Sequence, residues 1–427
     1  MLKYFSHNAP VFLLLSLLIV LGNIHPVLGS IALILVMAFW ALKEKNQWLI
    51  LVFSFTLILG DSRVEYLLPF KGMRYAAISL LFIKVIWDFM RNKYKPNPLI
   101  LPSIPFFFIA FLGVGFSPTP ATSLFKALSY LFLIVICLSY LPYYFKKKNY
   151  RLVDDFLYTA IFVFLMGFVY MIDYDWAYIN HRYRGFLGNP NGLGTFSAIM
   201  IPFGLMVYHR FPKKKRAALF LVIIGIISVI LTESRTALGA IFLFFFLFFV
   251  YQGGKGRIRA FWFFGFPLAL FIFFSVPLET ILGIFGLDEF LRVESLKTGT
   301  GRFLAWAIGL TEIQNNLWIG RGFGYEEFFF YERRAILILT EHQGGMHNSY
   351  LTFLMNNGIL GVIPFVIFLL RLFSSVKIKK LGIPFIIIML ISANFESWLN
   401  SSLNSFTFFF FMVTSFLIYY KNLTYDR

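Results

Sequence analysis

The sequence predicts an all-α polytopic membrane protein, a bundle of about 12–14 transmembrane helices with one large extracytoplasmic loop that itself contains helices. Hydrophobic residues make up 59% of the 427 residues and charged residues only 14%, a balance more apolar than that of soluble proteins. Apolar runs of about 14–22 residues recur, and each can cross, or nearly cross, a hydrocarbon core of roughly 30 Å as a helix. Because backbone groups in lipid must bond within their own segment, helices are the expected spanning structure.

The apolar runs place the spanning segments in order along the chain. We expect spans near residues 8–22, 27–42, 47–60, 75–90, 99–115, 123–142, 153–172, 191–208, 217–232, 237–251, 260–276, 347–370, 381–395 and 403–420. Clusters of basic residues lie between them, such as Lys213–Arg216 and Lys377–Lys380, and such clusters are typical of cytoplasmic loops. The net charge of +18 therefore indicates topology rather than nucleic-acid binding, and both termini are expected in the cytoplasm.

One connection is far longer than the others. Residues 277–346 form a predicted extracytoplasmic loop of about 70 residues, and long loops in compact folds usually carry function. The stretch 301–316 contains apolar residues at helical spacing: Phe303, Leu304, Ala307, Ile308 and Leu310. This spacing predicts an amphipathic helix that lies along the membrane surface or packs on the bundle. We therefore divide the chain into N-terminal transmembrane helices, residues 1–180, and a second region, residues 181–420, that includes the loop.

Two outward-facing turns carry arginines suited to binding an anion. Arg182 and Arg184 precede a Gly-Asn-Pro-Asn turn that opens the span at 191–208, and a helix N-terminus attracts anions through its free N–H groups. Arg235 lies in "LTESRTALGA" where a span meets the outer solvent, a costly place unless the guanidinium is paired or binds an anion. Structural alternatives stay open, because arginines also extend to lipid headgroups and Glu233 could pair with Arg235.

A third arginine lies in the long loop. Arg302 follows the glycine-rich "TGTG" and begins the predicted amphipathic helix, so phosphate oxygens could approach its first N–H groups closely. The nearby "GRGFG" reads as a flexible turn, with Arg321 as a weaker candidate. We favour Arg184, Arg235 and Arg302 as anion ligands; for Arg302 the alternative is an ordinary loop arginine.

His347, followed by Asn348, stands at the threshold of the span at 347–370. The positive end of the helix dipole is expected to lower the pKa of the imidazole, so that a neutral ring could accept a proton. Gly358 and Gly361, about three turns on, would let a neighbouring helix approach this span. A lone histidine is more often a merely structural interfacial residue. No metal site is expected, because no other histidine or cysteine has ligand spacing, although His342 is near.

These motifs together resemble the O-antigen ligase family. The His-Asn pair followed by Gly358 and Gly361 has the spacing that O-antigen ligases carry at this point. "RGFLGNPNGLG", "ESRTALGA" and "GRFLAW…IGRGFG" are also similar to the domain that these ligases share with O-antigen polymerases. The resemblance covers roughly residues 180–420, whereas the N-terminal half matches only as a generic set of spans.

The resemblance implies a glycosyltransferase of the bacterial inner membrane with its active site facing the periplasm. Its donor would be a glycan on undecaprenyl diphosphate and its acceptor lipid A–core, in lipopolysaccharide biosynthesis, without cofactor or metal. Arg235 and Arg302, with Arg184, would hold the diphosphate, while His347 would activate the acceptor hydroxyl, supported by Asn348, Gly358 and Gly361. The anomeric centre would be inverted.

Two other functions remain open from the sequence. A polymerase, which joins lipid-linked repeats, has the same donor chemistry, so the arginines do not distinguish it from a ligase. A polysaccharide flippase or transporter is the alternative from another class. Transporters usually carry charged residues deep in spans and paired inverted halves, whereas here only Lys84 and Lys126 lie near span interiors.

Overall fold

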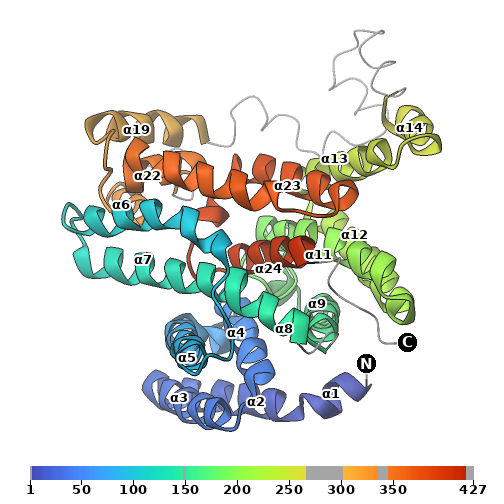
Figure 1. Cartoon of the computed structure of the whole chain (residues 1–427), viewed down its shortest axis with the longest axis horizontal. Coiled ribbons are helices and arrows are strands. Elements are labelled where there is room, and N and C mark those ends of the chain that lie inside the picture. Colours follow the sequence, from blue (N-terminus) through green and yellow to red (C-terminus); the bar gives the residue numbers. More distant parts are fainter. Residues whose placement is uncertain (1, 148–150, 266–301, 335–344, 420–427) are drawn as a thin grey trace.

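The computed structural model describes residues 2–147, 151–265, 302–334 and 345–419 (Figure 1). Helices make up 82% of the structure, with almost no strand. Within the described residues, β1 (Tyr178–Ile179) and β2 (Arg182–Tyr183) pair as a short antiparallel hairpin. The predicted all-α class is therefore confirmed.

The helices follow the apolar runs of the sequence. The α-helices are α1 (Leu2–His7), α2 (Ala9–Ile24), α3 (Pro26–Leu42), α4 (Asn46–Gly60), α5 (Phe70–Met90), α6 (Ile104–Val114), α7 (Pro120–Val135), α8 (Leu141–Lys147), α9 (Arg151–Val169), α10 (Tyr174–Ala177), α11 (Pro190–Arg210), α12 (Lys215–Thr232), α13 (Arg235–Gln252), α14 (Lys255–Ala260), α19 (Arg302–Asn315), α20 (Tyr325–Glu332), α22 (Ser349–Ser374), α23 (Lys379–Ala393) and α24 (Ser405–Tyr419). Short 3-10 or π segments are η1 (Glu65–Leu67), η2 (Pro98–Ser103), η3 (Ile136–Tyr140), η4 (Tyr170–Ile172), η5 (Pro212–Lys214), η6 (Phe261–Gly265) and η8 (Ser397–Asn400).

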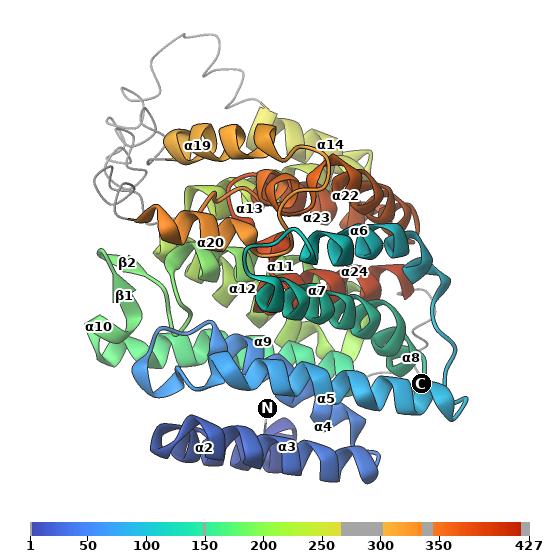
Figure 2. The ribbon, with the colours of Figure 1, turned by 90° about the vertical axis from the view of Figure 1, so that its left-hand side faces the viewer.

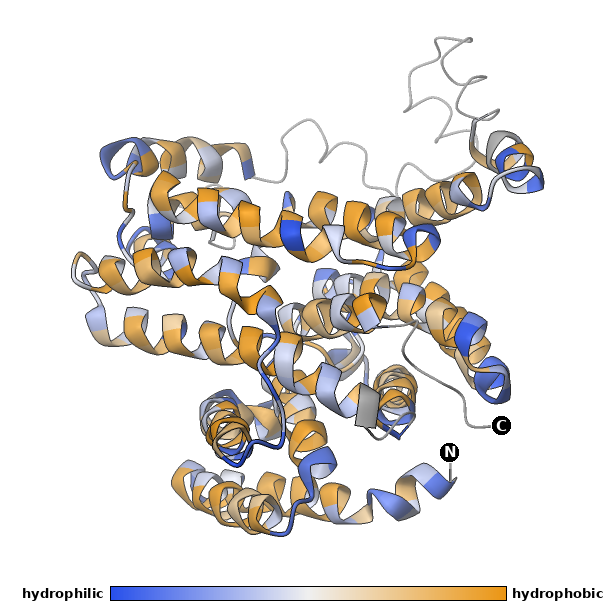
Figure 3. Cartoon of the chain, viewed as in Figure 1, coloured by the Kyte–Doolittle hydropathy of each residue, from blue (hydrophilic) through white to orange (hydrophobic). Residues whose placement is uncertain are grey.

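Several of these helices are suited to cross a membrane. By length and composition, six helices of the described residues qualify: 120–145, 151–172, 190–210, 212–232, 235–252 and 349–374. Five shorter apolar helices accompany them, at 9–24, 26–42, 46–60, 98–114 and 405–419. Hydrophobic residues cover most of their length and hydrophilic residues gather near their ends (Figure 3). Most of the expected span at 260–276 lies outside the described residues. The chain is a polytopic membrane protein.

The helices stack in layers around a buried centre. Both ribbon views show α2 and α3 on one side, then α4 and α5, and on the opposite side α22 and α23, with α19 packed outside α22 (Figures 1 and 2). Helices α11 and α24 form the centre. Phe408 and Phe411 of α24 are fully buried, and 83% of the residues in the most apolar stretch of α11 are buried. Because other helices enclose α11, its polar groups at the helix start can face protein rather than lipid.

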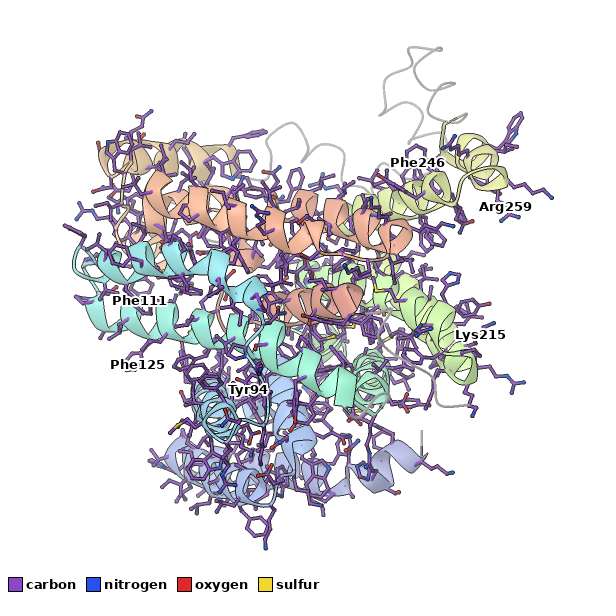
Figure 4. All side chains as sticks on the ribbon, in the orientation of Figure 1. Tyr94, Phe111, Phe125, Lys215, Phe246 and Arg259 are labelled. Atoms are coloured by element: carbon purple, nitrogen blue, oxygen red, sulfur yellow. The ribbon has the colours of Figure 1, made fainter. Side chains whose placement is uncertain are left out.

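Polar contacts between distant segments define the two ends of the bundle. At one end, which we call the His347 end, Asp61 accepts hydrogen bonds from the backbone N and Oγ of Ser405 at 2.9 and 2.6 Å. At the other, which we call the basic end, Lys214 Nζ lies 2.6 Å from Asp154 Oδ2. The exposed Lys215 and Arg259 lie on this side in Figure 4. The helix ends near the predicted cytoplasmic clusters thus lie together, opposite His347.

Candidate functional site

The carboxylate of Glu396 joins three distant segments at the His347 end. Its Oε1 accepts hydrogen bonds from Asn191 Nδ2 at 2.8 Å and from Arg302 Nη2 at 3.1 Å. Its Oε2 lies 3.6 Å from His347 Nδ1. Glu396 itself follows α23, Asn191 lies in the first turn of α11, and Arg302 begins α19. The structure therefore brings the predicted Arg302 and His347 to one carboxylate.

Neighbouring segments fix the short loop that carries His347. Asn348 caps α22, because its Oδ1 accepts from the backbone N of Tyr350 and Leu351 at 3.0 and 3.1 Å. The backbone N of Met346 donates to Glu326 Oε1 at 2.6 Å, and Trp306 Nε1 donates to Met346 O at 2.8 Å. His347 itself has a φ of +46°, in the left-handed region that few residues adopt. The imidazole is thus oriented by a strained, firmly bonded backbone.

The charges around His347 reverse the expected direction of its pKa shift. Burial lowers the pKa of the imidazole, and the positive charge of Arg302 lowers it further. The hydrogen bond and negative charge of Glu396 outweigh both, with a smaller contribution from Glu326, so the pKa of His347 is raised above its ordinary 6.5. The prediction that the pKa of His347 is lowered is wrong, because the carboxylate of Glu396, 3.6 Å from the ring, raises it.

Gly358 interrupts α22 instead of packing against a helix. Its φ of +58° and ψ of −174° are not helical. The backbone N–H groups that follow the break donate to the segment between α19 and α20 instead of to α22. Ile359 N donates to Leu317 O at 2.9 Å and Leu360 N to Trp318 O at 3.0 Å. On the other side of the break, Gly322 N donates to Asn356 O at 2.8 Å. The expected approach of a helix at Gly358 is therefore wrong, since a loop backbone occupies that space.

Gly361 and the "GRGFG" turn complete this arrangement. A Cβ at Gly361 would lie 3.4 Å from Ile109 of α6, so a neighbouring helix does approach there, as expected. Gly320, Gly322 and Gly324 all have positive φ, and a Cβ at any of them would lie within 3.0 Å of neighbouring atoms. The turn that the sequence suggested as flexible is instead packed between α22, α6 and α7.

Replacing Gly358 with alanine should destabilise the protein and misplace His347. The new Cβ would lie 2.3 Å from the carbonyl carbon and oxygen of Trp318, in a backbone conformation that alanine disfavours. We expect the free energy of unfolding to fall by about 1–3 kcal/mol, and a lower Tm in detergent measures this loss. Gly239→Ala is the matched control, because nothing lies within 4 Å of a Cβ there and α13 should gain slightly. Equal Tm values for the two variants would contradict this account.

The second predicted arginine turn is tied to the same cluster through Arg182. Arg182 Nε donates to Thr232 O at 3.0 Å, and its Nη2 donates to Asn191 Oδ1 at 2.9 Å. Thr232 ends α12, three residues before Arg235 begins α13. A Cβ at Gly194 would lie 2.7 Å from Ala237 Cβ, so the first turns of α11 and α13 are in contact. The Arg235 turn therefore adjoins the helix start that contacts Glu396.

Arg184 is placed differently from the other predicted arginines. Its side chain donates to two carbonyls, Nε to Trp176 O at 3.2 Å and Nη2 to Asp175 O at 2.9 Å. It is 9% exposed and holds α10 against the hairpin. Arg321 also faces elsewhere, since its Nε lies 4.0 Å from Glu312 Oε1 and its guanidinium covers the ring of Tyr325. Of the pair in "HRYRG", Arg182 rather than Arg184 is bonded to the Glu396 cluster.

The amphipathic helix expected over 301–316 is present as α19 in the described residues from Arg302 onward. Its buried side consists of Ala305, Gly309 and Ile313. The larger apolar side chains of the predicted face point outward, with Phe303 58% and Leu310 44% exposed. Small residues thus let α19 lie close against the bundle. The preceding "TGTG" and His342 lie outside the described residues.

Sequence reasoning missed Glu396, Asn191 and Glu326. Glu396 is the single acid in the short stretch between the last two expected spans, on the same predicted side as the arginines and His347. A lone carboxylate there was a usable signal, because basic groups at a membrane boundary need a counter-charge. Glu326 gave no such signal, since it is one of two adjacent acids in a loop.

Comparison with known proteins finds a family that part of the chain resembles. Residues 217–366 match the model of the O-antigen ligase family. No curated protein matches the chain significantly. The matched segment includes Arg235, Arg302 and His347, whereas Glu396 lies beyond it. The match supports a function of the O-antigen ligase or polymerase type, acting on lipid-linked glycans in a membrane. Residues 217–366 are therefore similar to the O-antigen ligase domain, and the resemblance of the chain to the O-antigen ligase family is confirmed.

Proposed function

We propose that the protein transfers a glycan from undecaprenyl diphosphate to lipid A–core at the periplasmic face of a bacterial inner membrane. The observation that carries this proposal is the cluster at Glu396, where a guanidinium and an imidazole from the matched domain contact one carboxylate. A diphosphate leaving group needs positive charge, and a sugar hydroxyl needs a base. The cluster supplies both within one site.

The proposed reaction is a direct displacement. The acceptor oxygen attacks the anomeric carbon of the donor sugar, and the bond from that carbon to the diphosphate oxygen breaks, so the configuration inverts. Arg302 and Arg235 stabilise the negative charge that develops on the departing diphosphate. The acceptor proton goes to His347, and we assign it to Nε2 because Nδ1 faces Glu396. Arg184 acts indirectly, by holding the segment that precedes α11.

Glu396 is the proposed positioning residue of the site. A carboxylate beside the imidazole favours the charged ring that forms when His347 takes the proton. The same carboxylate holds Arg302 and Asn191, which keeps the helix starts of α11 and α19 beside the loop of His347. Asn348, Gly358 and Gly361 support the site through the cap, the break and the packing of α22.

Substituting Glu396 with glutamine should shift the pH dependence of transfer. The base acts only while neutral, so the rate rises as the pH passes upward through the pKa of His347. Because Glu396 raises that pKa, its loss should move the rising limb to lower pH, and the plateau should fall because the imidazolium is less stabilised. A pH profile of kcat/KM measures both effects. Glu332→Gln, at an exposed acid of α20, should keep the wild-type profile, and an unshifted limb in Glu396→Gln would refute the role of the carboxylate.

An acceptor assay tests the function itself. The full chain in lipid nanodiscs is given undecaprenyl-diphosphate-linked glycan alone, or together with lipid A–core. Glycosylated lipid A–core is the expected product. Longer lipid-linked chains from the donor alone would show a polymerase instead. Glycan that moves across a vesicle membrane with no new covalent product would indicate a transporter and overturn the proposal.

A further inference from the structure

A polar pocket lies beside the site and shares Glu326 with the loop of His347. It is lined by residues of α5, α7, α20 and α22 and by the segment 400–403. Its empty space of about 440 Å³ includes the open solvent at its mouth, so the pocket is an open recess rather than an enclosed cavity. Glu326 is common to both places, because its Oε1 accepts from Met346 N, next to His347.

Two asparagines of the pocket have buried polar atoms without a partner among the described residues. Asn356 is fully buried, and its Oδ1 accepts from Glu326 N at 2.9 Å, which leaves Nδ2 as a donor with no acceptor. Asn400 is 8% exposed, and its Oδ1 is an acceptor with no donor. A buried polar group left unbonded costs about 1–3 kcal/mol. Arg74, which also lines the pocket, has a buried Nε without a partner among the described residues, so two unused donors and one unused acceptor await a ligand that offers both kinds of group.

The charges of the pocket argue against an anion. Arg74 Nη1 donates to Leu403 O at 2.7 Å and lies 3.6 Å from Asp61. Lys126 forms an ion pair with Glu327, at 2.5 Å. Both cations thus already face carboxylates, and Glu326 adds a further acid to the lining. A phosphate would find no surplus of positive charge here, whereas a neutral ligand with many hydroxyl groups would not need one.

The remaining lining residues suit such a ligand. Ser401 and Ser402 add hydroxyl groups that can donate and accept, and Tyr75, 39% exposed, adds a flat apolar ring. Hydroxyls around an apolar ring face are the features of a pyranose. Asn356 lies two turns of α22 beyond Asn348, roughly 12 Å along the helix. The pocket is therefore close to the reaction centre without being part of it.

We propose that this pocket binds a neutral pyranose of one of the two glycan substrates, a few bonds away from the reacting centre. Asn356 and Asn400 would bond ring hydroxyls and Tyr75 would cover one sugar face. The inference rests on the proposed function for the identity of the glycan, but sugar binding itself does not require transfer. The sugar could belong to the donor chain or to the saccharide of the acceptor, and the inhibition pattern separates these sources.

The test uses the full chain in nanodiscs and small probes. Methyl glycosides of glucose, galactose and N-acetylglucosamine are titrated by saturation-transfer NMR, and inorganic diphosphate is added separately as a competitor. At least one glycoside should bind the wild type. Ser401→Phe, which fills the pocket, and Asn400→Leu, which removes the unused acceptor, should each weaken binding tenfold or more. Ser374→Phe, exposed at the basic end of α22, is the matched control and should bind as the wild type does.

The outcomes separate this proposal from the proposed function. The sugar site is overturned, even if transfer proceeds, when no glycoside binds the wild type. It is also overturned when Ser401→Phe and Asn400→Leu bind the glycoside as tightly as the wild type does at unchanged Tm. Displacement of the glycoside by inorganic diphosphate shows an anion site and overturns it as well. Loss of sugar binding in both variants upholds it even if the acceptor assay gives no product. Inhibition competitive with the donor assigns the pocket to the donor glycan, and inhibition competitive with lipid A–core to the acceptor.

Discussion

Replacement of His347 with alanine should abolish measurable glycan transfer while the protein still folds in the membrane. In the proposed reaction the acceptor hydroxyl would lose the base that takes its proton, and loss of general-base catalysis costs roughly 10²–10⁴-fold in rate. Transfer of glycan to lipid A–core measures the loss, and Tm in detergent checks the fold. His25→Ala, at an exposed histidine between α2 and α3, should transfer at the wild-type rate.

A second substitution separates chemistry from backbone strain. The φ of +46° at His347 is one that asparagine adopts more readily than alanine does. His347→Asn should therefore keep the loop and the cap of α22 but remain inactive, since an amide is no base near neutral pH. Transfer close to the wild-type rate by His347→Ala or His347→Asn would end the assignment of this residue as the base.

Replacement of Arg302 with alanine should have the next largest effect. Loss of one charged group that stabilises a developing anion costs on the order of 10²–10³-fold in kcat. Arg302→Lys should recover part of the rate, because an ammonium keeps the charge but not the two-pronged geometry. Arg321→Ala is the matched control, since that guanidinium faces Glu312 and Tyr325. Competition by undecaprenyl diphosphate should weaken in Arg302→Ala only.

Arg302→Ala also has a pH signature opposite to that of Glu396→Gln. The charge of Arg302 lowers the pKa of His347, so its removal should raise that pKa and move the rising limb of kcat/KM to higher pH. The two variants should therefore displace the limb in opposite directions. A shift in the same direction would show that Arg302 and Glu396 do not act on one imidazole.

The fold was largely readable from the sequence because lipid imposes a simple rule on length and polarity. The apolar runs predict the helices of the described residues, and the cap at Asn348 follows a local signal. The sequence also indicated that Arg302 and His347 face the same side, although not that Glu396 lies between them.

What the sequence missed depends on tertiary contacts. The direction of the His347 pKa shift is set by Glu396, a residue far along the chain. Arg184 satisfies two backbone carbonyls, whereas Arg182 reaches Asn191, and residue type alone does not distinguish them. The spacing of Gly358 predicts a helix-packing position. Its positive φ instead depends on contacts with the loop between α19 and α20, and spacing along α22 does not reveal such contacts.

The break at Gly358 restricts where the outer loop can change in length. Residues 317–322 lie between two helices and would ordinarily tolerate added residues, as connecting segments do. Here their carbonyl and N–H groups complete the backbone bonding of α22 on both sides of the break. One added residue would shift these hydrogen bonds by one position along α22. The start of that helix, with Asn348 and His347, would then be displaced. Homologues should therefore vary in loop length elsewhere and keep this connector at constant length.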